Sequence, residues 1–321
     1  MTRRIRDGII LPGAKQQEGS NMQDPGSERR PSFINNYAKF ITARYPDLEG
    51  AEMRMVAQGG QFNDALLVDG RLIFRFPRYE QGIEQMRREV AFLRGIRGQT
   101  TLPVPDPIYA DLESDTLGEL FMGYALLPGE PLLRTAVFAQ TDDAVLDRWA
   151  EQLAGFLQEL HAIPPGDTGE EWPAADQRAE WELMYDEIRH HLFPKMRPDA
   201  RQEVKDHFAA YLDDPALHDF QPAPRHGDFG SGNILYEAQT MNISGIIDFG
   251  FAAVGDPAID IAAVSTLGDA LFGRFAATYP GVESMLPRAR FYRGTYALQE
   301  ALHGFKSGDR EAYEAGMASY V

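Results

Sequence analysis

The chain has 321 residues, of which 44% are hydrophobic and 25% are charged, as in globular proteins with a sizeable core. Its formal net charge of −17 argues against nucleic acid as a partner, because phosphates would be repelled. The absence of cysteine excludes a disulfide scaffold, a zinc–thiolate site and a cysteine nucleophile. Apolar runs fall short of the roughly 20 residues that a membrane span needs, so we expect no membrane partner and a cytoplasmic location.

The first 31 residues differ in composition from the rest of the chain. They are polar, rich in Gly, Arg and Gln, and lack sustained apolar periodicity. The apolar stretch at residues 8–12 is shorter than the roughly 7–15 residues of a secretory signal. We therefore expect a flexible leader or tag over residues 1–31. A short helix through Phe40 and Ile41 is expected to begin near Phe33.

Residues 53–76 are predicted to form strands. Asp69-Gly70 separates two apolar runs, and this dipeptide favours a two-residue hairpin turn because both positions need positive φ. A helix is predicted over residues 81–96, where apolar side chains recur at nearly helical spacing. Two further strands are expected at 108–110 and 120–127, and Pro128-Gly129 ends the second of them.

The remainder of the chain reads as mostly helical. Helices are predicted at 145–160, 181–192, 201–212 and 290–305, interrupted by short strands between residues 234 and 247. The expected fold class is α+β with two lobes. A small β-rich lobe with one main helix is expected over residues 32–127, and a larger, mostly helical lobe over residues 128–321.

Two neighbouring segments carry the residues that point to chemistry. Asp228 and Asn233 are five residues apart in a glycine-containing loop, and Asp248 follows a short apolar run. Two paired strands, at 234–236 and 244–247, would return Asp248 to the side of Asn233. Each fragment alone also suits an ordinary turn, since Asp and Asn are frequent turn formers.

Together these side chains suit phosphoryl transfer. That reaction needs one carboxylate to orient or deprotonate the attacking hydroxyl, and oxygen ligands to hold Mg²⁺ on the nucleotide phosphates. A metal-dependent phosphoesterase is an alternative use of clustered carboxylates. Hydrolysis of phosphate esters without a nucleoside triphosphate would support that alternative.

The spacing of Asp228 and Asn233, followed by Asp248-Phe249-Gly250, resembles protein kinases, although Gly227 replaces the usual arginine. With His226-Gly227-Asp228 and the segment 255–260 added, the chain resembles the aminoglycoside phosphotransferase superfamily over about residues 33–321. Within this superfamily, the segments 243–250 and 291–293 resemble the 2″-phosphotransferase branch of the aminoglycoside enzymes. Phe251 departs from the acidic residue common in that branch. The resemblance implies the two-lobe protein-kinase-like fold and phosphorylation of a small molecule. It also implies that the small lobe binds the nucleotide and that the large lobe carries the catalytic loop and the acceptor site.

The resemblance also implies roles for individual residues. Asp228 matches the catalytic base, and Asn233 and Asp248 match the Mg²⁺ ligands. His226 and Asp260 match positions that support the catalytic loop. At Asp256-Pro257, the residue types favour a helix N-cap followed by proline in the first turn.

On the nucleotide side, Gly60 and Asn63 match the family's phosphate-covering loop. The following strand carries Arg75 where a lysine is usual, with Glu89 as its predicted helix partner. Arginine suits the role because its guanidinium binds phosphate oxygens and stays charged. Arg78 is the fallback candidate.

The segment 124–129 fits the connection between the lobes. Backbone groups of Ala125 and Leu127 are expected to face the purine, because an extended connector has unpaired donors and acceptors. Tyr124 matches the gatekeeper position, where a large side chain narrows the purine pocket. ATP is the expected co-substrate, with GTP as an alternative.

The acidity of the chain favours a small cationic acceptor held by carboxylates. The candidates are Glu182, Glu187 and Glu300, each of which also suits a solvated helix face. An aminoglycoside-like antibiotic is favoured, and an amino alcohol, homoserine or a sugar is the alternative. A nucleotide-binding module without turnover is a further alternative. We expect a monomer or homodimer.

Overall fold

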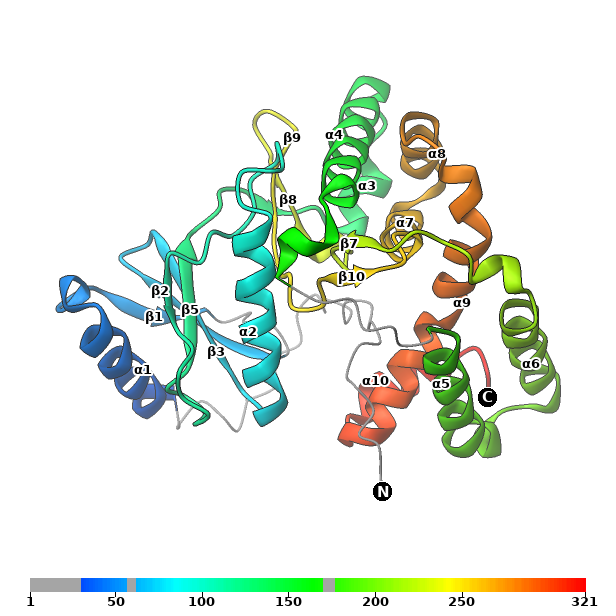
Figure 1. Cartoon of the computed structure of the whole chain (residues 1–321), viewed down its shortest axis with the longest axis horizontal. Coiled ribbons are helices and arrows are strands. Elements are labelled where there is room, and N and C mark those ends of the chain that lie inside the picture. The colour runs from blue at the N-terminus through cyan, green and yellow to red at the C-terminus, as the bar shows by residue number, and fades with distance from the viewer. Residues whose placement is uncertain (1–29, 57–61, 170–176) are drawn as a thin grey trace.

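The computed structural model describes residues 30–56, 62–169 and 177–321. The expected leader and Gly60 lie outside these residues, apart from positions 30 and 31, which belong to a helix. A β-rich lobe and a mostly helical lobe lie side by side, as expected from the sequence (Figure 1). None of the described helices has the length and apolar character needed to cross a membrane.

The small lobe is built on one antiparallel sheet with strand order β1-β2-β3-β5-β4. Its strands are β1 (Met53–Met55), β2 (Asn63–Val68), β3 (Leu72–Pro77), β4 (Tyr109–Asp111) and β5 (Phe121–Ala125). The predicted hairpin turn joins β2 to β3, with positive φ at both Asp69 and Gly70.

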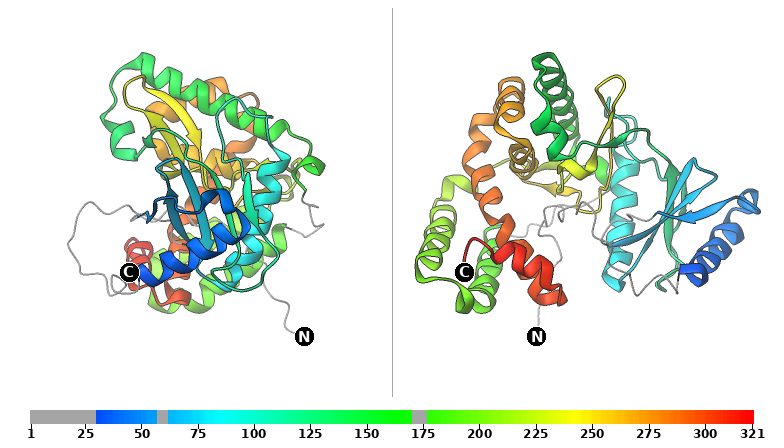
Figure 2. Two further views of the ribbon diagram at one scale, coloured as in Figure 1. Left: turned by 90° about the vertical axis from the view of Figure 1, so that its left-hand side faces the viewer. Right: turned by 180° about the vertical axis from the view of Figure 1, so that it is seen from behind.

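Alternation along β3 assigns its side chains to opposite faces of this sheet. Phe74 and Phe76 pack toward α1 (Arg30–Arg44), together with Ile41. The other face meets α2 (Glu80–Gly95), whose Met86 and Val90 pack against β5. Because Arg75 alternates with the two phenylalanines, its side chain lies on the α2 side of the sheet. The helix α2 itself lies between the sheet and the large lobe (Figures 1 and 2).

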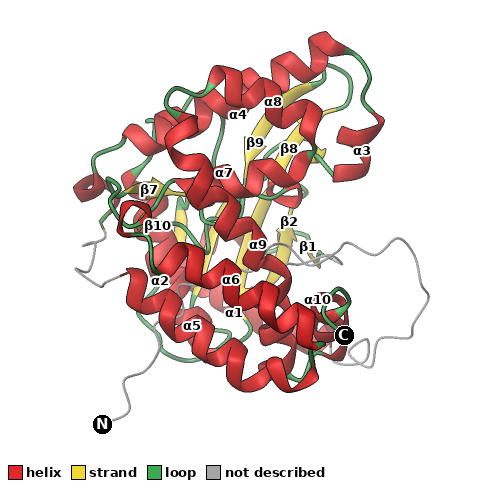
Figure 3. Cartoon of the chain, turned by 90° about the vertical axis from the view of Figure 1, so that its right-hand side faces the viewer, coloured by secondary structure: helices red, strands yellow, loops and turns green. Residues whose placement is uncertain are grey.

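The large lobe buries one extended apolar core, which also includes the end of α2. Its helices are α3 (Arg134–Ala139), α4 (Asp143–Ala162), α5 (Gln177–His191), α6 (Pro198–Leu212), α7 (Ala258–Val264), α8 (Asp269–Thr278), α9 (Val282–Ser307) and α10 (Arg310–Met317). The helices α5, α6, α9 and α10 gather at one end of the lobe (Figure 3).

Short strands carry the loops of the site. β8 (Ile234–Glu237) pairs with β9 (Asn242–Ile246) and with β6 (Glu130–Pro131). A second pair joins β7 (Ala223–Arg225) to β10 (Ala253–Gly255). The sequence predicted the β8–β9 pair but not β6, β7 or β10, which have only two or three residues each.

Two predicted boundaries were wrong. The late helix was placed at 290–305, but α9 begins at Val282 and contains Pro287. Pro257 was expected in the first turn of α7, but it is the cap residue, since the helix begins at Ala258. The Asp256 carboxylate nevertheless accepts a hydrogen bond from the Ala258 amide at 3.0 Å, as a capping side chain does.

Candidate active site

Asp228 and Asn233 lie on the loop between β7 and β8. A short 3-10 turn, Ser231–Asn233, precedes β8 and turns the asparagine back toward the aspartate. The Asn233 amide nitrogen donates to the backbone oxygen of Asp228 at 2.9 Å and to its carboxylate at 3.0 Å. Since this amide nitrogen is used inside the loop, the Asn233 side-chain oxygen is the atom left for a cation.

Pairing of β8 with β9 brings Asp248 to the same place. Ile234 is opposite Ile246, and the Ile247 amide donates to the Asn233 carbonyl at 2.9 Å. Asp248 has a φ of 64°, a left-handed conformation that costs energy for a residue with a side chain. The predicted convergence of Asp228, Asn233 and Asp248 at one mouth is therefore present in the fold.

The environment of Asp228 suits a general base. Burial, together with the negative charge of Asp248, raises the pKa of Asp228 from 3.8 to about 7. The hydrogen bond from Asn233 opposes this rise. A carboxylate with a pKa near neutrality accepts a proton from a hydroxyl more readily than an ordinary aspartate does.

Arg75 bridges the two lobes. One guanidinium nitrogen donates to Glu89 on α2 at 2.6 Å, and another donates to Asp248 at 2.8 Å. Burial alone would lower the pKa of Arg75, but the two carboxylates raise it, so the cation is retained. Glu89 is the predicted partner, whereas the contact with Asp248 was not foreseen.

His226 and Asp260 form hydrogen bonds with the backbone of the loop that carries Asp228. Asp260, fully buried on α7, accepts the amides of His226 and Gly227, both at 2.8 Å. The His226 ring accepts the Asp228 amide at 3.2 Å through Nδ1 and reaches the Ile247 carbonyl at 3.0 Å through Nε2. Burial lowers the pKa of His226, which favours a neutral ring that donates from Nε2.

Two contacts of the site carried no recognisable signal in the sequence. Gln85 on α2 donates to the Gly250 carbonyl at 2.8 Å, and His161 on α4 lies 3.1 Å from Asp260. Both contacts join segments far apart in the chain, so only knowledge of their pairing could have revealed them.

The inter-lobe connection has the orientation expected of a purine-binding segment. The Leu126 amide bonds to the Arg71 carbonyl at 2.8 Å, so Leu126 faces β3. Alternation along an extended chain then turns the backbone groups of Ala125 and Leu127 away from that strand. Tyr124 is buried beside them, on the same face as Arg75.

Asn63 and Arg78 lie at the open end of the β2–β3 hairpin, away from its turn. Asn63 begins β2 opposite Pro77. Arg78 bonds to Asp64 at 2.7 Å, and the same carboxylate accepts the Tyr37 hydroxyl from α1 at 2.7 Å. Arg78 is thus held on the side of the sheet opposite to Arg75.

The three carboxylates considered for the acceptor lie on α5 and α9. Glu182 is 3.1 Å from Arg178, and Glu187 is 2.8 Å from Lys306. The contact with Lys306 is the largest cause that lowers the pKa of Glu187. Glu300 is half-buried on α9.

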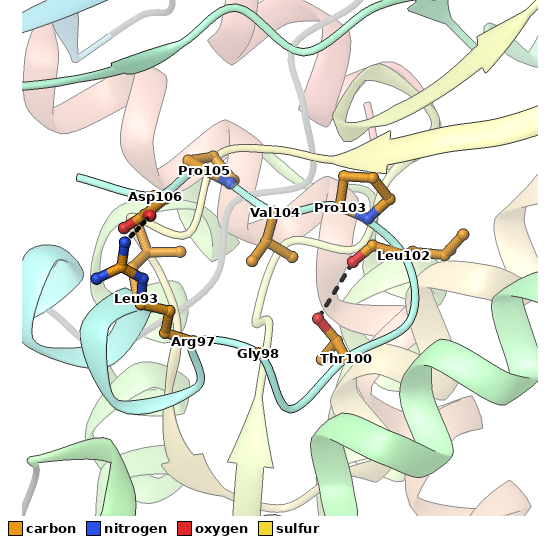
Figure 4. A pocket seen from close by; sticks show the side chains of 9 residues that line it. All are labelled: Leu93, Arg97, Gly98, Thr100, Leu102, Pro103, Val104, Pro105 and Asp106. Atoms are coloured by element: carbon orange, nitrogen blue, oxygen red, sulfur yellow. Dashed lines mark hydrogen bonds and ion pairs between the residues drawn. The ribbon is translucent and has the colours of Figure 1, made fainter. Parts of the chain in front are cut away.

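A small cavity of about 210 Å³ lies at the C-terminal end of α2, away from these residues (Figure 4). It is bounded by Leu93 and the loop 97–106, and an Arg97–Asp106 ion pair of 2.5 Å crosses it. Its lining residues include none of the catalytic candidates, so we do not assign it to the reaction.

The fold and the site together define a kinase-like phosphotransferase. An aspartate, an asparagine five residues later and a further aspartate converge beside an arginine–glutamate pair. A family model described as the phosphotransferase enzyme family matches residues 55–292, and the chain belongs to that family. The resemblance to the aminoglycoside phosphotransferase superfamily is thereby confirmed.

Individual relatives agree with this assignment. Viomycin phosphotransferase of Streptomyces vinaceus is 29% identical over 268 residues, which cover 81% of this chain and 90% of that protein. The GDP and kanamycin complex of APH(2″)-IIIa superposes with a TM-score of 0.80 at 25% identity, covering 88% of this chain and 96% of that one. Macrolide 2′-phosphotransferase MphH from Brachybacterium faecium shares the fold, with a TM-score of 0.63 at 22% identity over 90% of this chain and 97% of that one. The protein is thus a nucleotide-dependent phosphotransferase that acts on a small molecule.

Proposed function

We propose that the protein transfers the terminal phosphate of ATP or GTP to a hydroxyl of a small cationic antibiotic. The observation that carries this proposal is the hydrogen bond between Asn233 and Asp228 next to the Arg75–Asp248 contact. This arrangement supports the proposal that Asp228 accepts a proton and that Arg75 binds phosphate. The similarity to viomycin phosphotransferase and to an enzyme solved with kanamycin supports an antibiotic acceptor.

Asp228 would accept the proton of the attacking hydroxyl. Its hydrogen bond from Asn233 orients one carboxylate oxygen and leaves the other for the acceptor. Because its pKa is about 7, much of the population is ionised at neutral pH. Arg75 would bind phosphate oxygens of the nucleotide, and Glu89 would hold the guanidinium in place.

Asn233 and Asp248 fit a Mg²⁺ ion. Their side chains offer hard oxygen atoms, and the Asp248 side chain is 40% exposed, so it is accessible to a ligand. Among the described residues, no group of three or more His, Cys, Asp or Glu side chains could hold a metal. Two protein oxygens agree with the habit of Mg²⁺, which takes its other ligands from phosphates and water. When bound, the ion would neutralise charge on the transferred phosphoryl group.

The remaining assignments follow the same geometry. Ala125 and Leu127 would bond to the purine, and Tyr124 would close the back of its pocket, which leaves ATP and GTP both open. Asn63 would approach the phosphates. Glu182, Glu187 and Glu300 would bind ammonium groups of the acceptor, and an ammonium at the first two would have to displace Arg178 or Lys306.

Phosphate transfer from labelled ATP and GTP, measured in parallel with Mg²⁺, tests the proposal. The acceptors are kanamycin, gentamicin, streptomycin, viomycin, a macrolide, choline and homoserine. We expect transfer to at least one antibiotic, and its loss in Asp228→Asn. The control is Asp186→Asn, which breaks only an exposed ion pair on α5. Absence of transfer to every antibiotic would refute the proposal.

A further inference from the structure

Next to Asp228 in the large lobe is a group of residues, Arg225, Gly227 and Phe251, to which the proposed reaction assigns no role. Arg225, buried at the end of β7, donates to the Phe251 carbonyl at 3.3 Å. A Cβ atom on Gly227 would lie 2.5 Å from the Arg225 guanidinium and 2.1 Å from the Phe251 carbonyl oxygen. Gly227 therefore leaves room for Arg225 to hold the loop after Asp248 against the catalytic loop.

Aromatic contacts connect this group of residues to the small lobe and to α9. The Phe251 ring meets the Phe62 ring edge to face, with centroids 5.8 Å apart. Phe62 belongs to the small lobe, and its ring also meets His303 of α9 at 6.3 Å. The N-terminal end of β2, the loop after Asp248 and α9 thus approach one another at a single place.

Tyr296 lies on α9 between two positions whose contacts are known. Tyr292, one turn earlier, bonds to Asp256 at 2.8 Å, and His303, two turns later, meets Phe62. Residues four and seven apart share one face of a helix, so Tyr296 shares the face of Tyr292 and His303. That face runs from the start of α7 to the aromatic contact between the lobes.

The charges that act on Tyr296 agree with this position of its helix face beside the catalytic loop. Burial is the largest cause that raises its pKa, followed by the negative charges of Asp260 and Asp228, while Arg293 and Arg225 lower it. Arg293 itself is fixed by a bond to the Ser265 carbonyl at 3.0 Å. The raised pKa keeps the phenol protonated, so its hydroxyl is available as a hydrogen-bond donor.

We propose that Tyr296 is an acceptor-positioning residue, whose hydroxyl donates a hydrogen bond to an oxygen next to the hydroxyl that Asp228 deprotonates. This inference rests on the proposed function and narrows its substrate class. An acceptor with neighbouring oxygens, as on a sugar ring, satisfies both Asp228 and Tyr296. An amino alcohol with a single hydroxyl satisfies only Asp228.

The test compares Tyr296→Phe with the wild type, using kanamycin and viomycin as separate probes and choline as the single-hydroxyl probe. Removing one hydrogen bond is expected to raise the acceptor KM by about 3- to 10-fold. The KM for ATP should stay within about twofold, because Tyr296 lies on the acceptor side. The ring is kept and no described bond is lost, so the variant should fold.

Tyr279→Phe is the matched control, since it removes a buried hydroxyl that lies 2.7 Å from His161. It should lower thermal stability and leave the ratio of acceptor KM to ATP KM unchanged. An unchanged acceptor KM in Tyr296→Phe, equal rises in both KM values, or transfer to choline in preference to both antibiotics would overturn the role of Tyr296. A different result tests the proposed function: if the wild type transfers phosphate to no antibiotic, the proposed function is refuted, and the role of Tyr296 is refuted with it.

Discussion

Replacing Asp260 by asparagine should loosen the catalytic loop. The two carboxylate oxygens accept the buried amides of His226 and Gly227, one each, and asparagine keeps only one acceptor. The side-chain NH₂ group of the asparagine would then face the other backbone N–H, and two donors cannot form a hydrogen bond with each other. The aspartate is fully buried, so water cannot replace the lost partner.

The expected cost follows from these contacts. A buried donor left without a partner costs about 1–3 kcal/mol, and loss of a charged acceptor adds to this. We expect the free energy of unfolding to fall by about 2–4 kcal/mol, which lowers the melting temperature by roughly 5–12 °C. Displacement of Asp228, two residues from His226, should lower kcat by about 10- to 100-fold.

The pH dependence of this contribution has a definite sign. Burial by itself raises the pKa of Asp260, but the hydrogen bond and charge of His161, with the Gly227 amide, lower it overall. A lowered pKa in the folded state adds stability above the unfolded value of 3.8, and this stability is lost as the pH falls below it. The melting temperatures of Asp260→Asn and the wild type should therefore converge in acid.

Thermal unfolding and steady-state kinetics at pH 7.5 would measure both effects. Asp256→Asn is the matched control, because Asp256 is equally buried and bonds to Arg288 and Tyr292 rather than to the catalytic loop. It should lose comparable stability but retain kcat at temperatures where it is folded. A kcat of Asp260→Asn equal to that of the control would refute the reasoning.

Four further outcomes are expected. Asp228→Asn should lower turnover by about 10²–10⁴-fold, the scale of a general base, with nucleotide affinity mostly kept in a binding titration. In the wild type, kcat/KM should rise as the pH passes through about 7, because the base must be ionised, and a rate independent of pH from 6 to 8 would contradict this. Arg75→Lys should raise the ATP KM by about 3- to 10-fold, since one ammonium cannot reproduce a guanidinium that bridges two carboxylates; an unchanged KM would count against this role. Gly227→Ala should lower both activity and melting temperature, because its φ of 85° and the Phe251 carbonyl leave no room for a Cβ; wild-type values for both would be the contrary result.

Several elements could be predicted because their cause is local. Two apolar runs identified β2 and β3, and the positive-φ dipeptide between them identified their turn. Helical spacing of apolar residues identified α2 and α4 with boundaries close to those observed. The pairing of Arg75 with Glu89 was also foreseen, because the resemblance to kinases links those two positions.

Other features depend on contacts between distant segments. The bond between Arg75 and Asp248 spans 173 residues, and the contact of Gln85 with Gly250 spans 165. The pairing of β7 with β10 joins strands of three residues each, too short to show a period. The position of Arg225 beside Gly227 depends on that pairing.

The sequence by itself determined the identity and order of the candidate catalytic side chains and the lobe on which each lies. This was possible because turn-forming residues and apolar periodicity act over a few residues at a time. Only the tertiary structure decided which charges share a buried space. The pKa of Asp228 near 7 and the left-handed conformation of Asp248 arise from packing that brings remote segments together and excludes water.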